Sequence, residues 1–225
     1  MNELEPYLKS TKFLESDSQP VREFATRATE GATGEIAKAV ALYYAIRDGI
    51  RYDPYVMATD PEQYRASVVA RLPAAYCIQK AILLGATARA IGVPSRLGFA
   101  DVRNHLTSPK LRETMGSDLF VYHGYTELFL EGRWVKATPA FNLGLCQRFG
   151  VLPLEFDGRH DSIFHPFDAE NRKHMEYVRS HGSFAEFPFE QVMEAFRREY
   201  PSLFGNLQAG TVSDELFRPS GSERR

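Results

Sequence analysis

The sequence has 225 residues, of which 44% are hydrophobic and 25% are charged, a composition typical of a soluble globular protein with a sizeable core. The formal net charge is -2, and the chain has neither the basic stripe of a nucleic-acid-binding protein nor the polybasic or amphipathic stretch of a membrane anchor. We therefore expect neither a nucleic acid nor a membrane as a partner.

The first residues, MNELEPYLKSTKF, carry charges and a proline in place of the apolar centre of a secretory signal. No stretch is apolar over the ~18 residues that a transmembrane helix needs. Two cysteines, Cys77 and Cys146, are too few for a disulfide framework or a zinc ribbon. The sequence therefore predicts a cytoplasmic protein with free thiols.

Three helices are predicted in the first half of the chain. Apolar residues at helical spacing indicate one helix within residues 16–31 and a second over about Thr33–Asp48. The apolar, alanine-rich stretch from Cys77 to about Ile91 predicts a third, buried helix. Gly92 suits the left-handed conformation after a helix end, and a proline follows it.

Strands are predicted mainly in the second half. Residues 95–103 have the composition of a strand, and two aromatic, β-branched runs predict a hairpin of Val121–Leu130 and Arg133–Thr138 that turns at EGR. Shorter helices are expected at residues 108–116, 142–150 and 188–200. No repeat or linker divides the chain, so we expect one α+β domain over 1–205, with its core at about 33–145 and a flexible tail at 206–225.

Cys77 and His123 are the candidates for chemistry. A cysteine acts as a nucleophile only as its thiolate, and the N–H groups at a helix N-terminus favour that negative charge. This effect alone is too small, so a base is needed within hydrogen-bond reach. Of the six histidines, only His123 lies inside the strong strand pattern, where a rigid backbone can direct it.

These motifs resemble the transglutaminase-like superfamily. The chain reads C-x(7)-GATARAIGVPSR and then HGYTELFLEGRWVKATPAFN, in the order and spacing of that family, over roughly residues 43–142. The resemblance implies a papain-like α+β core, in which a cysteine-bearing helix packs on an antiparallel sheet that carries the histidine. It also implies a Cys–His–Asp triad.

Matched position by position, the resemblance places Cys77 at the family's nucleophile and His123 at its base. Thr138 stands where the family has the triad aspartate, which is a departure from the family pattern. Substrate-binding positions are assigned to three aromatic residues beside these motifs: Tyr76, Tyr125 and Trp134.

The group that would orient the imidazole is left open among four residues. The hydroxyl of Thr138 can accept a hydrogen bond, as can the amide of Asn142 four residues later. Asp157 and Asp161 can approach from another segment. The second donor to an oxyanion, beside the backbone N–H of Cys77, is also left open.

The resulting prediction is a cysteine-dependent hydrolase of amide or peptide bonds that works through a thioester acyl-enzyme. Its alternatives are an amine-accepting acyltransferase and a binding or scaffolding module whose triad has decayed. A peptide or other amide-containing substrate is the expected partner, and no cofactor is expected. No metal is expected either, because the spacing of one histidine- and aspartate-rich group fits no standard zinc pattern: His160, Asp161, His165, Asp168 and His174.

Overall fold

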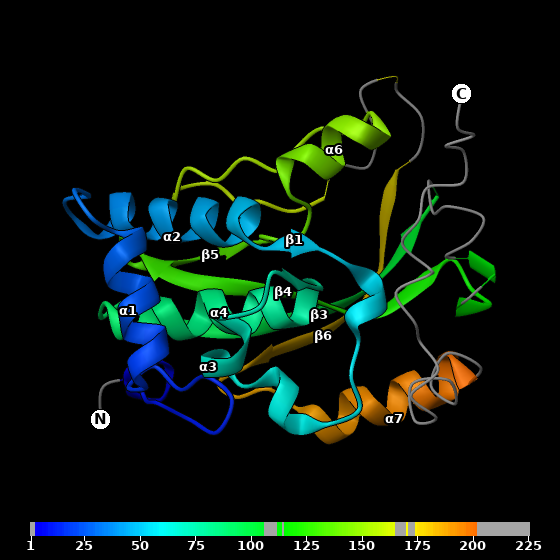
Figure 1. The fold of residues 1–225 in the computed structure, drawn as a ribbon, viewed down its shortest axis with the longest axis horizontal. Helices are drawn as coiled ribbons and strands as arrows, with labels where there is room; N and C mark the ends of the chain where they lie inside the picture. The colour runs from blue at the N-terminus through cyan, green and yellow to red at the C-terminus, as the bar shows by residue number, and fades with distance from the viewer. Residues whose placement is uncertain (1–2, 106–111, 114, 165–169, 171–173, 202–225) are drawn as a thin grey trace, which may run out of the picture.

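A computed structural model describes residues 3–105, 112–113, 115–164, 170 and 174–201 of the chain. Within these ranges the chain forms an α+β fold, with helices packed against one antiparallel sheet (Figure 1). The predicted tail at 206–225 and most of the predicted helix at 108–116 lie outside the described residues.

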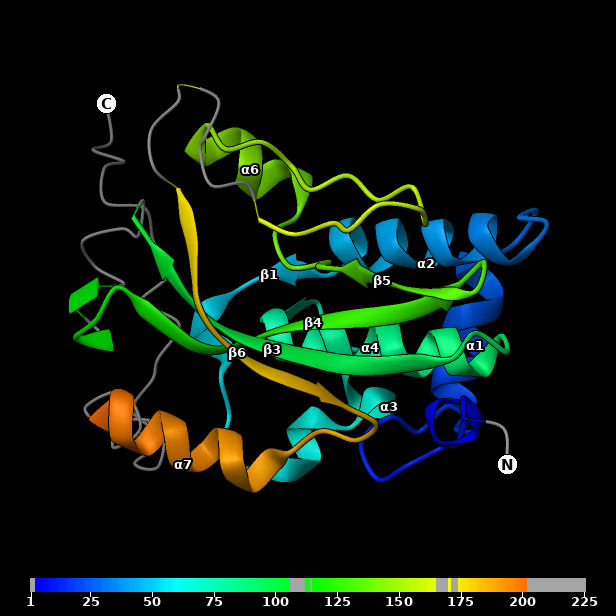
Figure 2. The same cartoon turned by 180° about the vertical axis from the view of Figure 1, so that it is seen from behind.

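The main sheet has four antiparallel strands in the order β5-β4-β3-β6. They are β3 (Ser95–Asn104), β4 (Leu119–Leu130), β5 (Arg133–Ala137) and β6 (Met175–Phe184). The predicted hairpin is confirmed: Glu131 and Gly132 both adopt positive φ, 49° and 82°, as a tight two-residue turn requires. Figure 2 shows the sheet from the side opposite α4.

The described residues form six α-helices: α1 (Gln19–Ala28), α2 (Glu35–Gly49), α3 (Ala66–Val69), α4 (Cys77–Ala90), α6 (Leu143–Phe149) and α7 (Phe189–Glu199). Three short 3-10 helices also form: η1 (Glu5–Tyr7), η2 (Pro54–Val56) and η3 (Pro61–Tyr64). The three helices predicted in the first half are confirmed as α1, α2 and α4, and those predicted at 142–150 and 188–200 as α6 and α7. Every residue of α4 up to Arg89 is buried, because α1, α2 and α3 surround it on one side and β3 and β4 cover the other. This helix is the centre of the core.

A short parallel pair of strands leads into α4. β1 (Arg51–Tyr52) pairs with β2 (Ala74–Ala75), and the backbone N–H of Asp53 donates to the carbonyl of Ala75 at 3.0 Å. This pairing holds the segment after β1 beside the first residue of α4.

The buried side chain of Lys80 joins three parts of the fold. Its Nζ donates to the carbonyls of Arg47 and Ile50 at the end of α2 and of Ala140 after β5, at 2.7–2.9 Å. Burial lowers the pKa of Lys80 to about 7, but the three contacts match the three N–H groups of a charged ammonium, since a neutral amine has only two. Lys80 therefore fixes the loop after β5 relative to α4.

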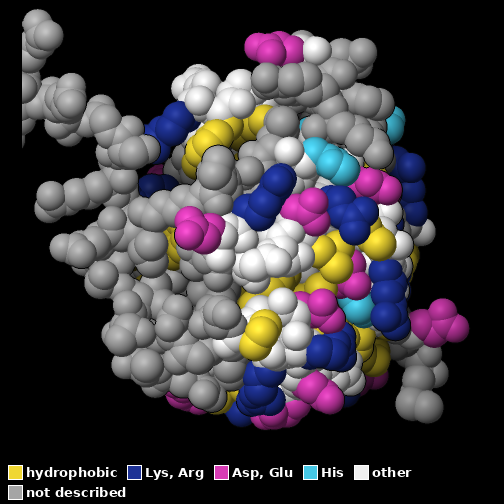
Figure 3. Space-filling view, turned by 90° about the vertical axis from the view of Figure 1, so that its right-hand side faces the viewer, with side chains coloured by type: hydrophobic (Ala, Val, Ile, Leu, Met, Phe, Trp, Pro, Cys, Tyr) yellow, Lys and Arg dark blue, Asp and Glu magenta, His cyan; other side chains and the backbone are white. Residues whose placement is uncertain are grey.

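Charges of both signs are interspersed on the face shown in Figure 3, with hydrophobic side chains between them. In the part of the chain that the structure describes, helices fall short of the length and apolar character that a membrane crossing requires.

The substitution Lys80→Met should lower the free energy of unfolding by at least about 2 kcal/mol, because three buried carbonyls lose their donor. Urea denaturation measures this change. Lys9→Met is the control, since the Lys9 side chain is 63% exposed and pairs only with Glu5; it should change stability by less than about 1 kcal/mol. Equal effects of the two substitutions would contradict the role given to Lys80.

Candidate active site

Cys77 is the first residue of α4, as the sequence predicted. Tyr76 precedes it in an extended conformation, and the backbone N–H of Tyr76 donates to Oε1 of Gln79 at 3.3 Å. The thiol is therefore at the positive end of a buried helix. Only 8% of Cys77 is exposed.

Strand β4 lies against the first turn of α4 at Gly124, the residue after His123. A Cβ atom built on Gly124 would lie 3.0 Å from the Cα of Ile78, a backbone atom that has no room to move aside. Glycine is therefore needed for this close approach. It also brings the backbone N–H of Gly124 toward Cys77, where this N–H lowers the pKa of the thiol.

The substitution Gly124→Ala should separate β4 from α4 and lower the free energy of unfolding by roughly 1–3 kcal/mol. Thermal unfolding followed by circular dichroism measures the effect. The matched control is Gly144→Ala in α6, where the added Cβ meets its nearest neighbour at an ordinary 3.6 Å. If the Gly124 variant is as stable as this control, the close approach is not tight.

The backbone that leads to His123 is irregular. Asp101 on β3 is opposite two residues of β4, since Ala100 pairs with His123 and Val102 with Phe120. In this bulge Tyr122 has φ +53°, a left-handed conformation that costs a non-glycine residue of order 1–3 kcal/mol. The bulge therefore decides where His123 lies relative to the strand.

Asp101 and His181 hold the bulge in place. One oxygen of Asp101 accepts from the backbone N–H of Tyr122 at 3.0 Å and from Nε2 of His181 at 2.6 Å. The rings of Tyr122 and His181 stack with centroids 3.9 Å apart. His181 lies on β6, so this edge strand of the sheet supports Tyr122, the residue before His123.

Asp101→Ala should destabilise the protein by roughly 1–3 kcal/mol, because two donors lose a shared, buried acceptor. Urea denaturation checks this, with Asp118→Ala as the control. Asp118 is 38% exposed and pairs with the equally exposed Arg103, so its loss should cost less than about 1 kcal/mol. If Asp101→Ala loses no more stability than Asp118→Ala, Asp101 does not support the bulge.

Thr138 follows β5 and is 1% exposed. Its carbonyl accepts from the hydroxyl of Tyr43 at 3.1 Å, but its Oγ1 has no hydrogen-bond partner among the described residues. The same is true of Nε2 of His123, which is also buried. The two residues that the resemblance pairs, His123 and Thr138, thus each have a buried polar atom without a partner among the described residues.

The other three orienting candidates have partners elsewhere. The side-chain oxygen of Asn142 accepts from the backbone N–H of Tyr52 at 3.0 Å, and Oδ1 of Asp161 accepts from that of Lys136 at 2.9 Å. Asp157 bonds to His160 on the surface. An aromatic ring, that of Phe164, packs against His123 with centroids 4.8 Å apart.

Burial controls the ionisation of the pair. It raises the pKa of the Cys77 thiol to about 11, even though the N–H of Gly124 and the first N–H groups of α4 lower it. Burial also lowers the pKa of His123 to about 3. At neutral pH the site therefore holds a neutral thiol and a neutral imidazole.

Cys77 and His123 line one partly open pocket. Its walls come from the segment after β1, from the junction of β2 and α4, from Met115, from the bulge of β4, and from α7 with the residue after it. The lining residues are Tyr52, Pro54, Met57, Tyr76, Cys77, Met115, Phe120, Val121, Tyr122, His123, Phe196 and Tyr200.

The sequence model of the transglutaminase-like superfamily matches residues 22–139, about half of the chain. The chain belongs to the transglutaminase-like superfamily. The matched residues include the helix with Cys77, the strand with His123 and Thr138. The predicted papain-like fold class is confirmed by this match together with the antiparallel sheet.

Solved structures with similar folds have low sequence identity to this transglutaminase-like chain. A protein from Cytophaga hutchinsonii, described as a candidate cysteine protease, has 16% identity and a TM-score of 0.48 over 81% of this chain and 54% of its own. A candidate protease from Parabacteroides distasonis has 18% identity and a TM-score of 0.39 over 60% and 25%. The chain thus spans about half the length of the first structure. No curated protein matches the sequence.

The three aromatic residues assigned to substrate binding have different positions in this transglutaminase-like fold. Tyr76 lines the pocket. Tyr125 is 5% exposed and covers Gly98, while Trp134 packs on Tyr7 with centroids 5.0 Å apart and on the guanidinium of Arg96 at 4.1 Å. Neither Tyr125 nor Trp134 is among the residues that line the pocket.

Sequence reasoning missed several pocket residues. Phe196 belongs to a predicted helix, and the spacing of apolar residues in that helix indicates that one face is buried. It does not indicate that this face lies in the pocket of Cys77, because that contact joins distant parts of the sequence. Tyr52 follows α2 without any catalytic motif. Among the described residues, no three His, Cys, Asp or Glu side chains are arranged to hold a metal ion.

Proposed function

We propose that the protein is a cysteine-dependent hydrolase of amide or peptide bonds. The observation that supports this most directly is that Cys77, at the tip of a buried helix, and His123, on the adjoining strand, line the same pocket. A nucleophile at a helix N-terminus with a base beside it is the minimum that thiol acyl chemistry requires.

In the proposed reaction the sulfur of Cys77 attacks the acyl carbon while His123 takes the thiol proton. The tetrahedral oxyanion is stabilised by the backbone N–H of Cys77. His123 then gives the proton to the leaving amine, the C–N bond breaks, and a thioester forms. Water attacks the thioester, loses its proton to His123, and releases the acid and the thiol.

The unsatisfied groups bear on the efficiency of this reaction. To accept the thiol proton at Nδ1, a neutral His123 must carry its proton on Nε2, which has no acceptor in the part of the chain that the structure describes. The imidazolium formed during attack then lacks the stabilisation that a carboxylate gives in a triad. The proton transfer is therefore expected to accompany attack, with no ion pair formed in advance.

The same observation favours a second candidate, a binding or scaffolding module that has lost its catalysis. Thr138 replaces the aspartate, and neither its hydroxyl nor the imidazole Nε2 is satisfied within the described residues. In that case the pocket would bind a ligand without breaking a bond.

Chemical labelling separates the two candidates. An acyl-type electrophile should modify Cys77, and mass spectrometry should find the label on that residue and not on Cys146. The rate should rise as the pH increases from 7 toward about 11, because the raised pKa leaves little thiolate at neutral pH.

Three variants serve as controls for this labelling. Cys77→Ala should abolish it, whereas Cys146→Ala should leave it nearly unchanged, since Cys146 is buried against the carbonyl of Phe141. His123→Ala should slow labelling at neutral pH more than in alkali. If the ratio of the electrophile's rate to that of iodoacetamide is no higher at Cys77 than at a cysteine in the urea-unfolded chain, the binding module replaces the hydrolase.

Thr138→Asp tests the departure from the family pattern. A carboxylate at this position should raise the pKa of His123 and lower that of Cys77. Labelling near neutral pH should then be faster than in the parent by about tenfold or more. Thr138→Asn is the uncharged control; if both variants label at the parent's rate, residue 138 does not act on the imidazole.

A further inference from the structure

The pocket beside Cys77 has mostly apolar and aromatic walls. Met57, Met115 and Phe196 contribute apolar side chains, and among the described residues no Asp, Glu, Lys or Arg lines it. We propose that the site accepts acyl substrates whose substituent next to the reacting carbonyl is apolar, and that Met57 and Phe196 set this preference. The inference rests on the proposed function and names its substrate class.

The polar atoms of two tyrosines in the wall already have partners in the protein. The hydroxyl of Tyr76 donates to that of Tyr64 at 2.7 Å. The hydroxyl of Tyr200 donates to the carbonyl of Leu119 at 2.7 Å and accepts from the backbone N–H of Val121 at 2.6 Å. These residues therefore offer their rings, and not free hydroxyls, to a ligand.

A charged substituent would lose its hydration in this pocket without meeting an opposite charge. Such a transfer is strongly unfavourable, whereas an apolar substituent gains from leaving water. A polar amide substituent lies between these cases, because it needs hydrogen-bond partners and the hydroxyls of Tyr76 and Tyr200 already have theirs.

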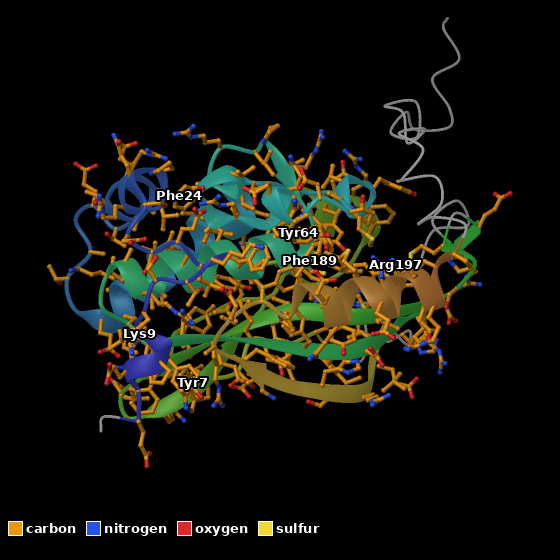
Figure 4. The ribbon with its side chains drawn as sticks, turned by 90° about the horizontal axis from the view of Figure 1, so that it is seen from below. Tyr7, Lys9, Phe24, Tyr64, Phe189 and Arg197 are labelled. Atoms are coloured by element: carbon orange, nitrogen blue, oxygen red, sulfur yellow. The ribbon has the colours of Figure 1, made fainter. Side chains whose placement is uncertain are left out.

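The wall formed by α7 is held firmly in place. At its start, Phe189 packs against Tyr64 with centroids 5.5 Å apart, and Figure 4 shows the two side chains next to each other. After its end, the hydroxyl of Tyr200 is hydrogen-bonded to the backbone of β4 at Leu119 and Val121. Phe196, between these anchors, is 2% exposed. Because α7 follows the residues 22–139 matched by the family model, this wall is an addition to the matched core.

The test uses N-acetyl-aminoacyl chloromethyl ketones with the side chains of Phe, Leu, Gln, Glu and Lys. Attack by the Cys77 sulfur forms a C–S bond and releases chloride, and intact-mass spectrometry gives the rate. Each rate is divided by the rate of the same probe with glutathione, which removes differences in intrinsic reactivity. The Phe and Leu probes should label Cys77 at least about tenfold faster than the Glu and Lys probes.

Two variants test the assigned residues. Met57→Lys, on a half-buried loop position, should raise the rate of the Glu probe relative to the Leu probe about tenfold. Val178→Lys is the matched control, since Val178 is 49% exposed on β6, and it should keep the parent's order. Phe196→Ala should slow labelling by the Phe probe more than labelling by the other probes. A melting curve shows whether the Phe196→Ala protein is folded. If it is not folded, Met57→Lys alone tests the inference.

The outcomes separate the inference from the proposed function. Labelling of Cys77 at equal normalised rates by all five probes, or fastest labelling by a charged probe, overturns the inference and leaves the hydrolase intact. If no probe labels Cys77, the hydrolase fails. The pocket is then tested by protection of Cys77 from iodoacetamide at alkaline pH, where the thiolate fraction of Cys77 increases. N-acetyl-phenylalanine amide should protect more than N-acetyl-glutamate amide, and equal protection overturns the inference.

Discussion

The close approach of β4 to the first turn of α4 is the constraint on which the site depends. It exists because residue 124 has no side chain, and it brings the backbone after His123 to the sulfur of Cys77. The rest of the fold supports this contact. Helices bury α4 on one side, Lys80 fixes its second turn to the loop after β5, and the bulge at Tyr122 sets the strand next to it.

The depth of this contact has an electrostatic consequence. A thiol and an imidazole that are both buried keep their neutral forms, unless a charge or a hydrogen bond compensates for the lost hydration. In a triad, a carboxylate on the far side of the imidazole gives that compensation. The resemblance to the family aligns Thr138 with that carboxylate, and within the described residues the hydroxyl of Thr138 has no hydrogen-bond partner. The chain therefore has the matched family core with a threonine where the family pattern has an aspartate.

Local patterns were sufficient to predict α4, the hairpin and the candidate pair. The alanine-rich, largely apolar run after Cys77, the glycine of the turn and the alternation around His123 each act over a few residues. Strand β6 was not predicted, because MEYVRSHGSF places polar residues on both faces and has no clean alternation. The left-handed Tyr122 was also missed, since its conformation depends on Asp101 and His181 from other strands.

The pocket shows the same limit at the level of function. Its cysteine and histidine come from motifs that can be recognised in the sequence, but its apolar wall comes from α7, more than seventy residues after His123. Likewise, the segment that carries Asp157 and Asp161, two of the four residues left open, packs the ring of Phe164 against the imidazole. Contacts between distant segments, which no local pattern encodes, decide both the ionisation of the pair and the walls around it.

Nitrogen NMR of the protein with ¹⁵N-labelled histidine rings tests the central claim most directly. The signals of His123 are assigned by their loss in His123→Gln. At neutral pH they should show one protonated and one unprotonated ring nitrogen, the neutral imidazole expected beside a neutral thiol. Two protonated ring nitrogens at neutral pH would reveal an imidazolium paired with a Cys77 thiolate, and would contradict this account.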